Sequence, residues 1–184
     1  MAVQASSPNV LELVRTVRQA RQYSPDPVPD EVIDQLLEVA RWTGSSRNSQ
    51  PWHFIVIKDK ELLRQISQLR PRINWIADAP LGIAIVLDGA NPDGEAYDDG
   101  RVTERLLITA RSLGLGGGMA RNSDAGQQAE VKRILGIPAE RTAGSLVTIG
   151  YPTSLKDPRP GGTAGGRKEL SEIASYNRWG QSKA

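Results

Sequence analysis

Apolar residues recur along this chain in two patterns, one typical of helices and one typical of strands. Spacings of three and four residues predict amphipathic helices over residues 8–20, 30–42, 59–69, 101–113 and 124–135. Ser7 and Pro8 would supply the N-cap and first turn of the first of them. Short unbroken apolar runs predict buried strands over residues 54–57, 81–87 and 146–149.

Two segments between these elements carry composition typical of loops. Residues 88–100 combine glycine, proline and asparagine with five acidic residues, which predicts a solvated loop. Residues 114–118 include four glycines and predict a turn that ends the preceding helix. Helices therefore flank a few strands without strict alternation, and we expect an α+β fold with a mainly antiparallel sheet.

The length of 184 residues suits one domain, over residues 1–184. Near its end the composition changes to proline, glycine and threonine. This change predicts an extended arm over residues 152–166, followed by a C-terminal tail over residues 167–184.

Composition restricts the chemistry that the chain can perform. The sequence has no cysteine and one histidine, His53. A disulfide framework, a thiolate metal site and a cysteine nucleophile are therefore excluded, and we expect no metal. His53 lies between two aromatic residues with no implied acidic or serine partner, which favours a structural role. An enzyme of this composition would rely on another side chain or on a borrowed cofactor.

Charge and hydropathy do not favour nucleic acid or membranes as partners. The 23 lysines and arginines offset 21 acidic residues, which leaves a net charge of +2. No apolar run approaches the roughly 20 residues that span a bilayer. The N-terminal residues lack the basic and apolar regions of a secretory signal. We therefore expect a cytoplasmic protein.

Three polar or glycine-rich segments each allow two interpretations. Arg15, Arg18 and Arg21, three residues apart on the predicted first helix, form either a solvated basic face or an anion site. The glycines of 114–118 lack the spacing of a dinucleotide-binding fingerprint, so they favour a turn. They would also let a flat ligand approach the backbone. Residues 43–52 are either an ordinary loop or a set of donors and acceptors for a heterocycle.

Taken together and in order, these segments resemble the nitroreductase family of FMN-dependent oxidoreductases. The first segment, Arg15 to Tyr23, is similar to the family's opening Arg-Arg-Ser-x-Arg-x-Phe motif, with Val17 and Gln19 as departures. The Asn48-x-Gln50-Pro51-Trp52 run is similar to its Pro-Ser-x-x-Asn-x-Gln-Pro-Trp signature. Further matches are the Leu-Gly-Leu-Gly turn at 113–116, the Gly-Tyr-Pro run at 150–152 and the basic pair at 167–168.

The resemblance implies a set of residues that bind FMN. Arg18, Gln19 and Arg21 fall where the family binds the phosphate, the ribityl chain and the N1/O2 side of the ring. Ser45, Asn48 and Gln50 fall on a second flavin-binding segment, often supplied by the partner subunit. Ala120 and Arg121 fall where backbone groups of the family approach flavin N5. Arg167 and Lys168 fall on the family's C-terminal phosphate clamp. The resemblance assigns no catalytic residue.

The same resemblance implies a three-layer fold, an intertwined homodimer and an activity. NADH or NADPH would reduce the flavin at N5, and the electrons would pass to a nitroaromatic, a quinone or a similar small acceptor. Related flavin enzymes offer alternatives on the same fold, namely dehalogenation, dehydrogenation or flavin fragmentation. A non-catalytic flavin-binding protein or a basic interaction module is a further alternative, because Val17 and Gln19 remove phosphate-binding groups that the family usually has.

Overall fold

The structure is a computed structural model, and it describes residues 10–122, 124–153 and 167–183. The helices are α1 (Val10–Thr16), α2 (Asp30–Arg41), α3 (Lys60–Ser67), α4 (Pro92–Ser112), α5 (Ala125–Leu135) and α6 (Leu170–Ile173). The short 3-10 helices are η1 (Ser46–Asn48) and η2 (Pro71–Asp78). The strands are β1 (Trp52–Ile57), β2 (Leu81–Leu87), β3 (Gly116–Arg121) and β4 (Thr142–Gly150). The predicted cap at Ser7 and Pro8 lies outside the described residues.

The four strands form one sheet in the order β1-β2-β4-β3, and every neighbouring pair is antiparallel. The central strands β2 and β4 are buried almost throughout, since both faces of the sheet are covered. This explains why residues 81–87 are apolar at nearly every position rather than at alternate ones. The expectation of an α+β fold with an antiparallel sheet is confirmed.

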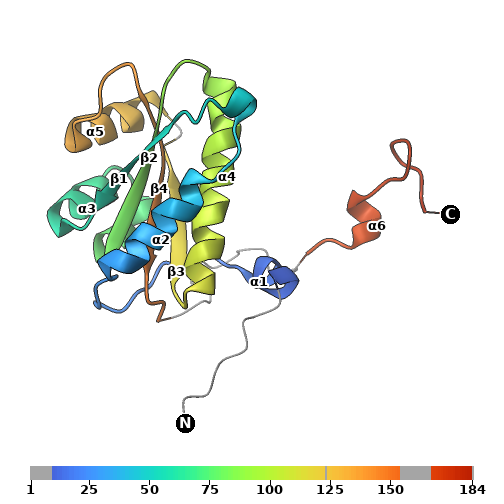
Figure 1. Cartoon of the computed structure of the whole chain (residues 1–184), viewed down its shortest axis with the longest axis horizontal. Coiled ribbons are helices and arrows are strands. Elements are labelled where there is room, and N and C mark those ends of the chain that lie inside the picture. The colour runs from blue at the N-terminus through green and yellow to red at the C-terminus, as the bar shows by residue number, and fades with distance from the viewer. Residues whose placement is uncertain (1–9, 123, 154–166, 184) are drawn as a thin grey trace, which may run out of the picture.

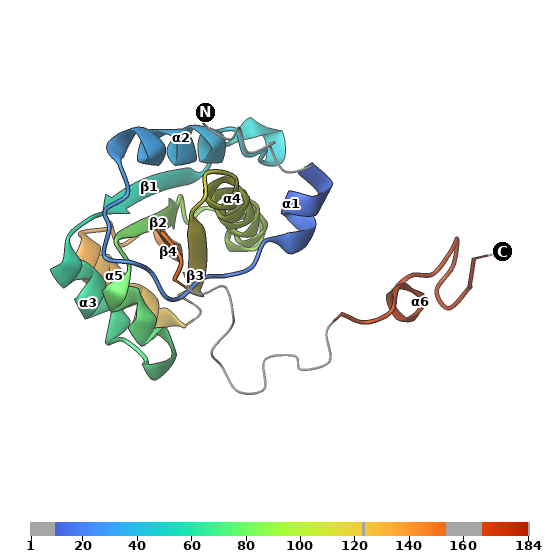
Figure 2. The ribbon, with the colours of Figure 1, turned by 90° about the horizontal axis from the view of Figure 1, so that it is seen from below.

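Helices cover both faces of the sheet, which gives three layers (Figures 1 and 2). Helices α2 and α4 pack on one face, where they contact Ile83 and Ile85 of β2. Helices α3 and α5 and η2 pack on the other, where Ala84 and Val86 point. Successive side chains of a strand alternate between the two faces, so β2 supplies both cores.

The predicted loop over residues 88–100 is wrong, because α4 begins at Pro92. The Asn91 side chain accepts a hydrogen bond from the N–H of Gly94 at 3.2 Å, which caps the helix. Glu95 accepts from the N–H groups of Gly89 and Asn91, at 3.1 and 3.0 Å. The carboxylate of Glu95 is buried and accepts both hydrogen bonds at the start of the helix, so this acidic residue serves capping rather than solvation.

The predicted turn over residues 114–118 is also wrong beyond Leu115, because Gly116 begins strand β3. Among the glycines of residues 114–118, Gly114 alone has the positive φ (77°) of a helix-ending glycine. The following glycines pair with β4, from Gly116 opposite Gly150 onward. Their lack of side chains serves close packing, since a Cβ on Gly117 would lie 2.7 Å from Leu107 of α4.

The first helix is shorter than the sequence predicts and ends at Thr16. The chain then runs alongside β3, where the N–H of Ala20 donates to the carbonyl of Gly117 at 2.8 Å. Pairing with an available strand edge satisfies these backbone groups as well as a helix would. Arg15, Arg18 and Arg21 therefore do not share one helix face.

Asp99 is a buried carboxyl group that joins α4 to the sheet. It accepts hydrogen bonds from the N–H and the hydroxyl of Ser145 in β4, at 3.1 and 2.7 Å. Gly144 leaves room for it, because a Cβ there would lie 2.9 Å from a carboxylate oxygen. Burial raises the pKa of Asp99, although the Ser145 hydrogen bonds and the charge of Arg121 act in the opposite direction.

We expect Asp99→Asn to change how stability depends on pH. A carboxyl whose pKa is raised by folding destabilises the folded state as pH rises from its unfolded value of about 3.9 through the raised value. The unfolding free energy of the wild type should therefore fall relative to Asp99→Asn across that window. Urea unfolding of both proteins at several pH values from about 4 to 8 measures the difference. A pH-independent difference would contradict this account.

Candidate functional site

The segment that follows α1 contacts strand β3 through the side chain of Gln19 as well as through its backbone. The side-chain oxygen of Gln19 accepts a hydrogen bond from the N–H of Met119 at 3.3 Å and another from the Arg21 guanidinium at 3.0 Å. The two segments are about 100 residues apart in sequence. The structure therefore brings together two of the segments that the sequence singled out, residues 18–21 and the glycine-rich strand.

Tyr23 anchors this segment to the sheet. Its hydroxyl donates to the carbonyl of Ala20 at 2.6 Å and shares a hydrogen bond of 2.8 Å with the Thr148 hydroxyl of β4. Burial raises the pKa of Tyr23, so the phenol keeps its proton at neutral pH. The backbone around Gln19 and Arg21 is thus held on both sides, by β3 and by this tyrosine.

Arginine side chains give this region its positive charge. The guanidinium of Arg18 is exposed and donates to the backbone carbonyls of Arg15 and Val17, at 3.0 and 2.7 Å. The guanidinium of Arg21 is half-buried and lies over the ring of Trp75, 5.5 Å from the ring centre. A guanidinium offers five donors in a planar fork, and this geometry matches the oxygens of a phosphate.

Ser45, Asn48 and Gln50 form a second polar segment around η1. The Ser45 hydroxyl accepts a hydrogen bond from the N–H of Gln50 at 2.8 Å, and the Gln50 amide donates to the carbonyl of Asn48 at 3.3 Å. Arg47, Asn48 and Gln50 all have positive φ, at 53°, 55° and 49°. This conformation is costly for residues other than glycine, and such strain often occurs in ligand-binding segments.

The two polar segments lie near different ends of α4 (Figure 1). The 45–50 segment lies beside the N-terminal half of the helix, where a Cβ on Gly44 would meet Arg101. Residues 18–21 lie beside β3, which packs on Leu107 nearer the other end. Within one chain the two segments therefore form separate surfaces.

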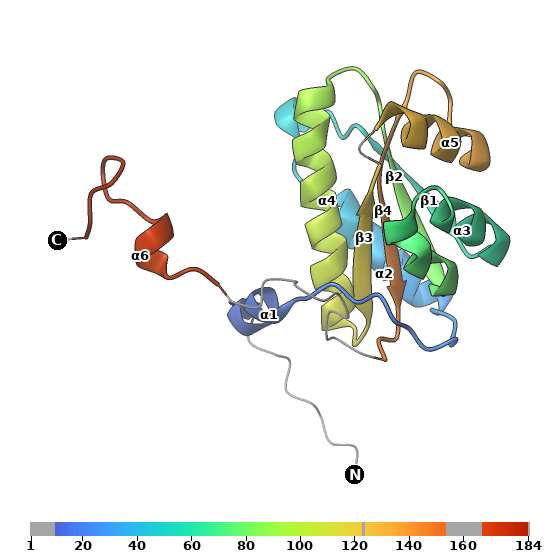
Figure 3. The same ribbon diagram turned by 180° about the vertical axis from the view of Figure 1, so that it is seen from behind.

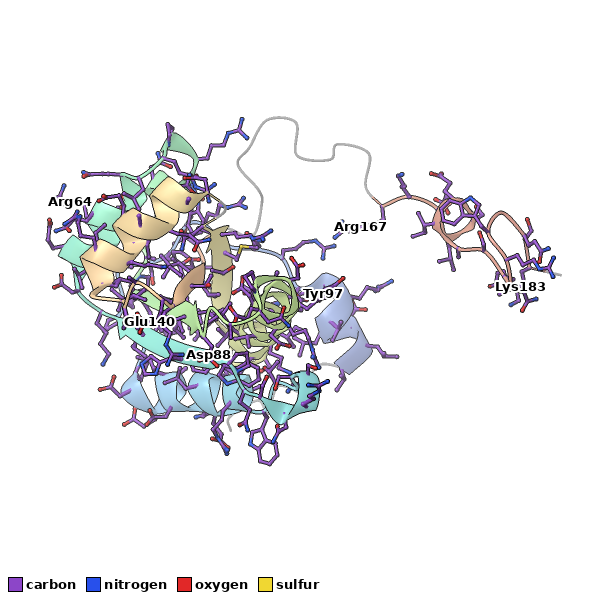
Figure 4. The ribbon with its side chains drawn as sticks, turned by 90° about the horizontal axis from the view of Figure 1, so that it is seen from above. Arg64, Asp88, Tyr97, Glu140, Arg167 and Lys183 are labelled. Carbon is purple, nitrogen blue, oxygen red and sulfur yellow. The ribbon has the colours of Figure 1, made fainter. Side chains whose placement is uncertain are left out.

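The remaining predicted site residues fall at two places. Ala120 and Arg121 end β3, where Ala120 is buried and the carbonyl of Arg121 accepts from Arg70 at 2.9 Å. Arg167 and Lys168 are exposed at the start of the C-terminal tail, which extends away from the sheet and its helices (Figures 3 and 4). The structure thus does not bring the basic pair to the other site residues of the same chain.

Trp75 and Tyr23 are neighbours of the site that motif reasoning missed as site residues. Trp75 lies in η2, between the third helix and the second strand, and no motif includes it. Tyr23 stands where the family motif has phenylalanine, but its hydroxyl contacts became visible only in the folded chain. The first motif therefore pointed to Tyr23, whereas nothing in the sequence pointed to Trp75.

Residues 10–122, 124–153 and 167–183 contain no cluster of acidic and histidine side chains that could hold a metal ion. Over the same residues, none of the helices is long and apolar enough to cross a membrane.

The fold and the site define a class of protein: a three-layer α+β domain that presents guanidinium, amide and backbone N–H groups around an aromatic ring. Guanidinium groups match phosphate oxygens, and amides match the carbonyl and N–H edge of a heterocycle. This donor set suits a planar heterocyclic ligand that also carries a phosphate.

Comparison with known proteins identifies the family within this class. A family model described as Nitroreductase family matches residues 14–81. A protein of Methanothermobacter thermautotrophicus, provisionally named NADH dehydrogenase/NAD(P)H nitroreductase, is 32% identical over 151 residues, 80% of this chain and 79% of that relative. The chain belongs to the nitroreductase family.

One more distant relative and one solved structure are described with FMN. FMN reductase [NAD(P)H] of Bacillus subtilis is 28% identical over 179 residues, 82% of this chain and 69% of that protein. A provisionally named nitroreductase of Desulfovibrio desulfuricans, solved in complex with FMN, superposes with a TM-score of 0.78 at 23% identity. The match covers 92% of this chain and 96% of that one. This last likeness confirms the fold.

We expect Gly118→Ala to disrupt the contact between residues 18–21 and β3. A Cβ at this position would lie 2.4 Å from the carbonyl oxygen of Ala20 and 2.9 Å from the Trp75 ring, so the segment must move. Overpacking of this kind costs about 1–3 kcal/mol. Urea unfolding of the variant measures the loss.

Gly100→Ala is the matched control, because nothing lies within 4 Å of a Cβ at this helical glycine. Alanine in a helix interior is favoured over glycine by about 1 kcal/mol, so this variant should be more stable than the wild type. Equal stability changes in the two variants would show that the tight contact at Gly118 does not matter.

Proposed function

We propose that this protein is an FMN-dependent oxidoreductase that transfers electrons from NADH or NADPH to a nitroaromatic, a quinone or a similar small acceptor. The observation that carries the proposal is the Gln19 network, which holds Arg21 against the glycine-rich strand β3. Membership of the nitroreductase family supports the same reading. FMN, when bound, supplies the two-electron chemistry for which the chain has no cysteine and only one histidine.

The residues present fit FMN by the chemistry of their donors. Arg18 and Arg21 offer guanidinium groups to an anion, and Gln19 offers an amide beside them. Arg21 would place its positive charge at the N1/O2 edge of the ring, where reduction adds negative charge. Ala120 and Arg121 would present backbone to the N5 side. Buried β3 would hold this backbone in place and exclude water from one face of the ring.

The second half of the site would come from a partner subunit. Ser45, Asn48 and Gln50 carry side chains suited to the same ligand but lie near the other end of α4. In a homodimer, the 45–50 segment of one copy would face residues 18–21 of the other. Arg167 and Lys168 would reach the phosphate of the FMN bound by the other copy, since the tail extends away from the sheet and helices of its own chain (Figure 4).

Exposed apolar side chains support the homodimer. Val10 of α1 is 71% exposed, and in the tail Leu170, Ile173 and Trp179 are 69%, 64% and 100% exposed. Scattered apolar residues are normal on a surface, but a tail with its apolar side chains directed to solvent has no core of its own. A second copy of this chain would cover both elements.

The absorbance spectrum of the purified protein tests the proposed function. We expect a bound or added flavin to give the visible bands of FMN, and anaerobic addition of NADH or NADPH to bleach them. Subsequent addition of a nitroaromatic or a quinone should restore the bands, because the acceptor takes the electrons. Protein that neither contains nor takes up FMN would refute the proposal. Bound FMN that neither nicotinamide reduces would indicate a non-catalytic flavin-binding protein.

We expect the double substitution Ile173→Ser, Trp179→Ser to shift the protein from dimer to monomer and to weaken FMN binding. Both effects share one cause, because the tail would complete the site of the other copy. Light scattering after size-exclusion chromatography measures the first effect, and flavin fluorescence titration measures the second. Ser171→Ala, Ser182→Ala is the control within the same tail. A dimer that survives the double substitution unchanged would contradict the proposed role of the tail.

A further inference from the structure

Trp75 belongs to none of the motifs, yet its ring contacts both halves of the Gln19 network. The indole N–H donates to the carbonyl of Arg72 at 3.1 Å, which fixes the ring within η2. The edge of the ring lies against β3, because a Cβ on Gly118 would be 2.9 and 3.0 Å from two of its carbons. The ring also packs on the apolar core between η2 and the sheet. These contacts hold the Trp75 ring beside the site.

The Arg21 guanidinium lies over one face of the Trp75 ring. The central guanidinium carbon lies 5.5 Å from the ring centre, within the range of a cation–π interaction. Gln19 accepts a hydrogen bond from one guanidinium nitrogen at 3.0 Å. The hydrogen bond restrains the direction of the guanidinium, and the ring restrains its plane. An arginine side chain otherwise has large rotamer freedom, which these two contacts reduce.

We propose that Trp75 is a positioning residue, which fixes the guanidinium of Arg21 in the orientation that FMN binding and flavin reduction require. The inference rests on the proposed function of this site. Trp75 acts through Arg21, so its removal takes away the contact that restrains the plane of the guanidinium. Removal of Trp75 should weaken the binding of reduced flavin more than that of oxidised flavin, because the N1/O2 edge gains its negative charge on reduction.

A double-mutant cycle between Trp75 and Arg21 tests the inference. The proteins are the wild type, Trp75→Leu, Arg21→Gln and the double variant, with Trp75→Phe as the conservative variant that keeps a ring face. FMN binding to each apoprotein is measured by quenching of flavin fluorescence. The affinity ratio of reduced to oxidised FMN is obtained from the midpoint potential of the bound flavin. Urea unfolding of each apoprotein reports on the fold.

We expect Trp75→Leu to weaken FMN binding about twofold to fivefold, the size of a cation–π contact at a partly exposed site. The affinity ratio of reduced to oxidised FMN should fall as well, and Trp75→Phe should restore part of both losses. In the Arg21→Gln background, Trp75→Leu should have no further effect. A purely structural tryptophan would instead weaken binding equally in both backgrounds.

The outcomes separate this inference from the proposed function. If the wild type binds no FMN, the proposed function fails and the inference falls with it. If the wild type binds FMN but Trp75→Leu leaves both measurements unchanged, only the inference is overturned. Equal losses with Arg21 present and absent would also overturn it. A Trp75→Phe variant that restores neither the FMN affinity nor the affinity ratio would overturn it as well.

Discussion

The candidate site depends on the close approach of residues 18–23 to strand β3. The backbone of Ala20 can approach β3 this closely, with a hydrogen bond to Gly117, because Gly116 and Gly118 carry no side chains where it packs. Once the two backbones are paired, Gln19 reaches Met119 and the Arg21 guanidinium. Tyr23 then fastens the far end of the segment to Thr148. The arginine is placed by backbone packing, before any ligand contributes.

The same packing divides the polar residues between two surfaces of one chain. Residues 18–21 follow β3, whereas the 45–50 segment is held by its own hydrogen bonds beside the N-terminal half of α4. Helix α4 is 21 residues long and rigid, so it keeps the two surfaces apart. A dimeric site would use both surfaces without moving either. Arg167 and Lys168 fit this arrangement, because the tail that carries them extends away from the sheet and helices of its own chain.

Much of the fold could be predicted because periodicity reports burial. Residues 81–87 form β2 with the predicted bounds, and α2 and α5 lie within one or two residues of theirs. The failures have local causes. Residues 88–100 look like a loop because capping uses the same asparagine, proline and acidic residues that loops use. Residues 114–118 look like a turn because glycine is favoured both in turns and where two backbones meet closely.

The sequence by itself determined the chemistry that this protein lacks, through the absent cysteines and the single histidine, and it determined the family through motifs in register. It could not show that Arg18 and Arg21 leave the first helix, since that depends on a strand edge about 100 residues away. It also gave no indication of Trp75 or of the buried Asp99–Ser145 link. These contacts join residues distant in sequence, and only tertiary packing decides which distant residues meet.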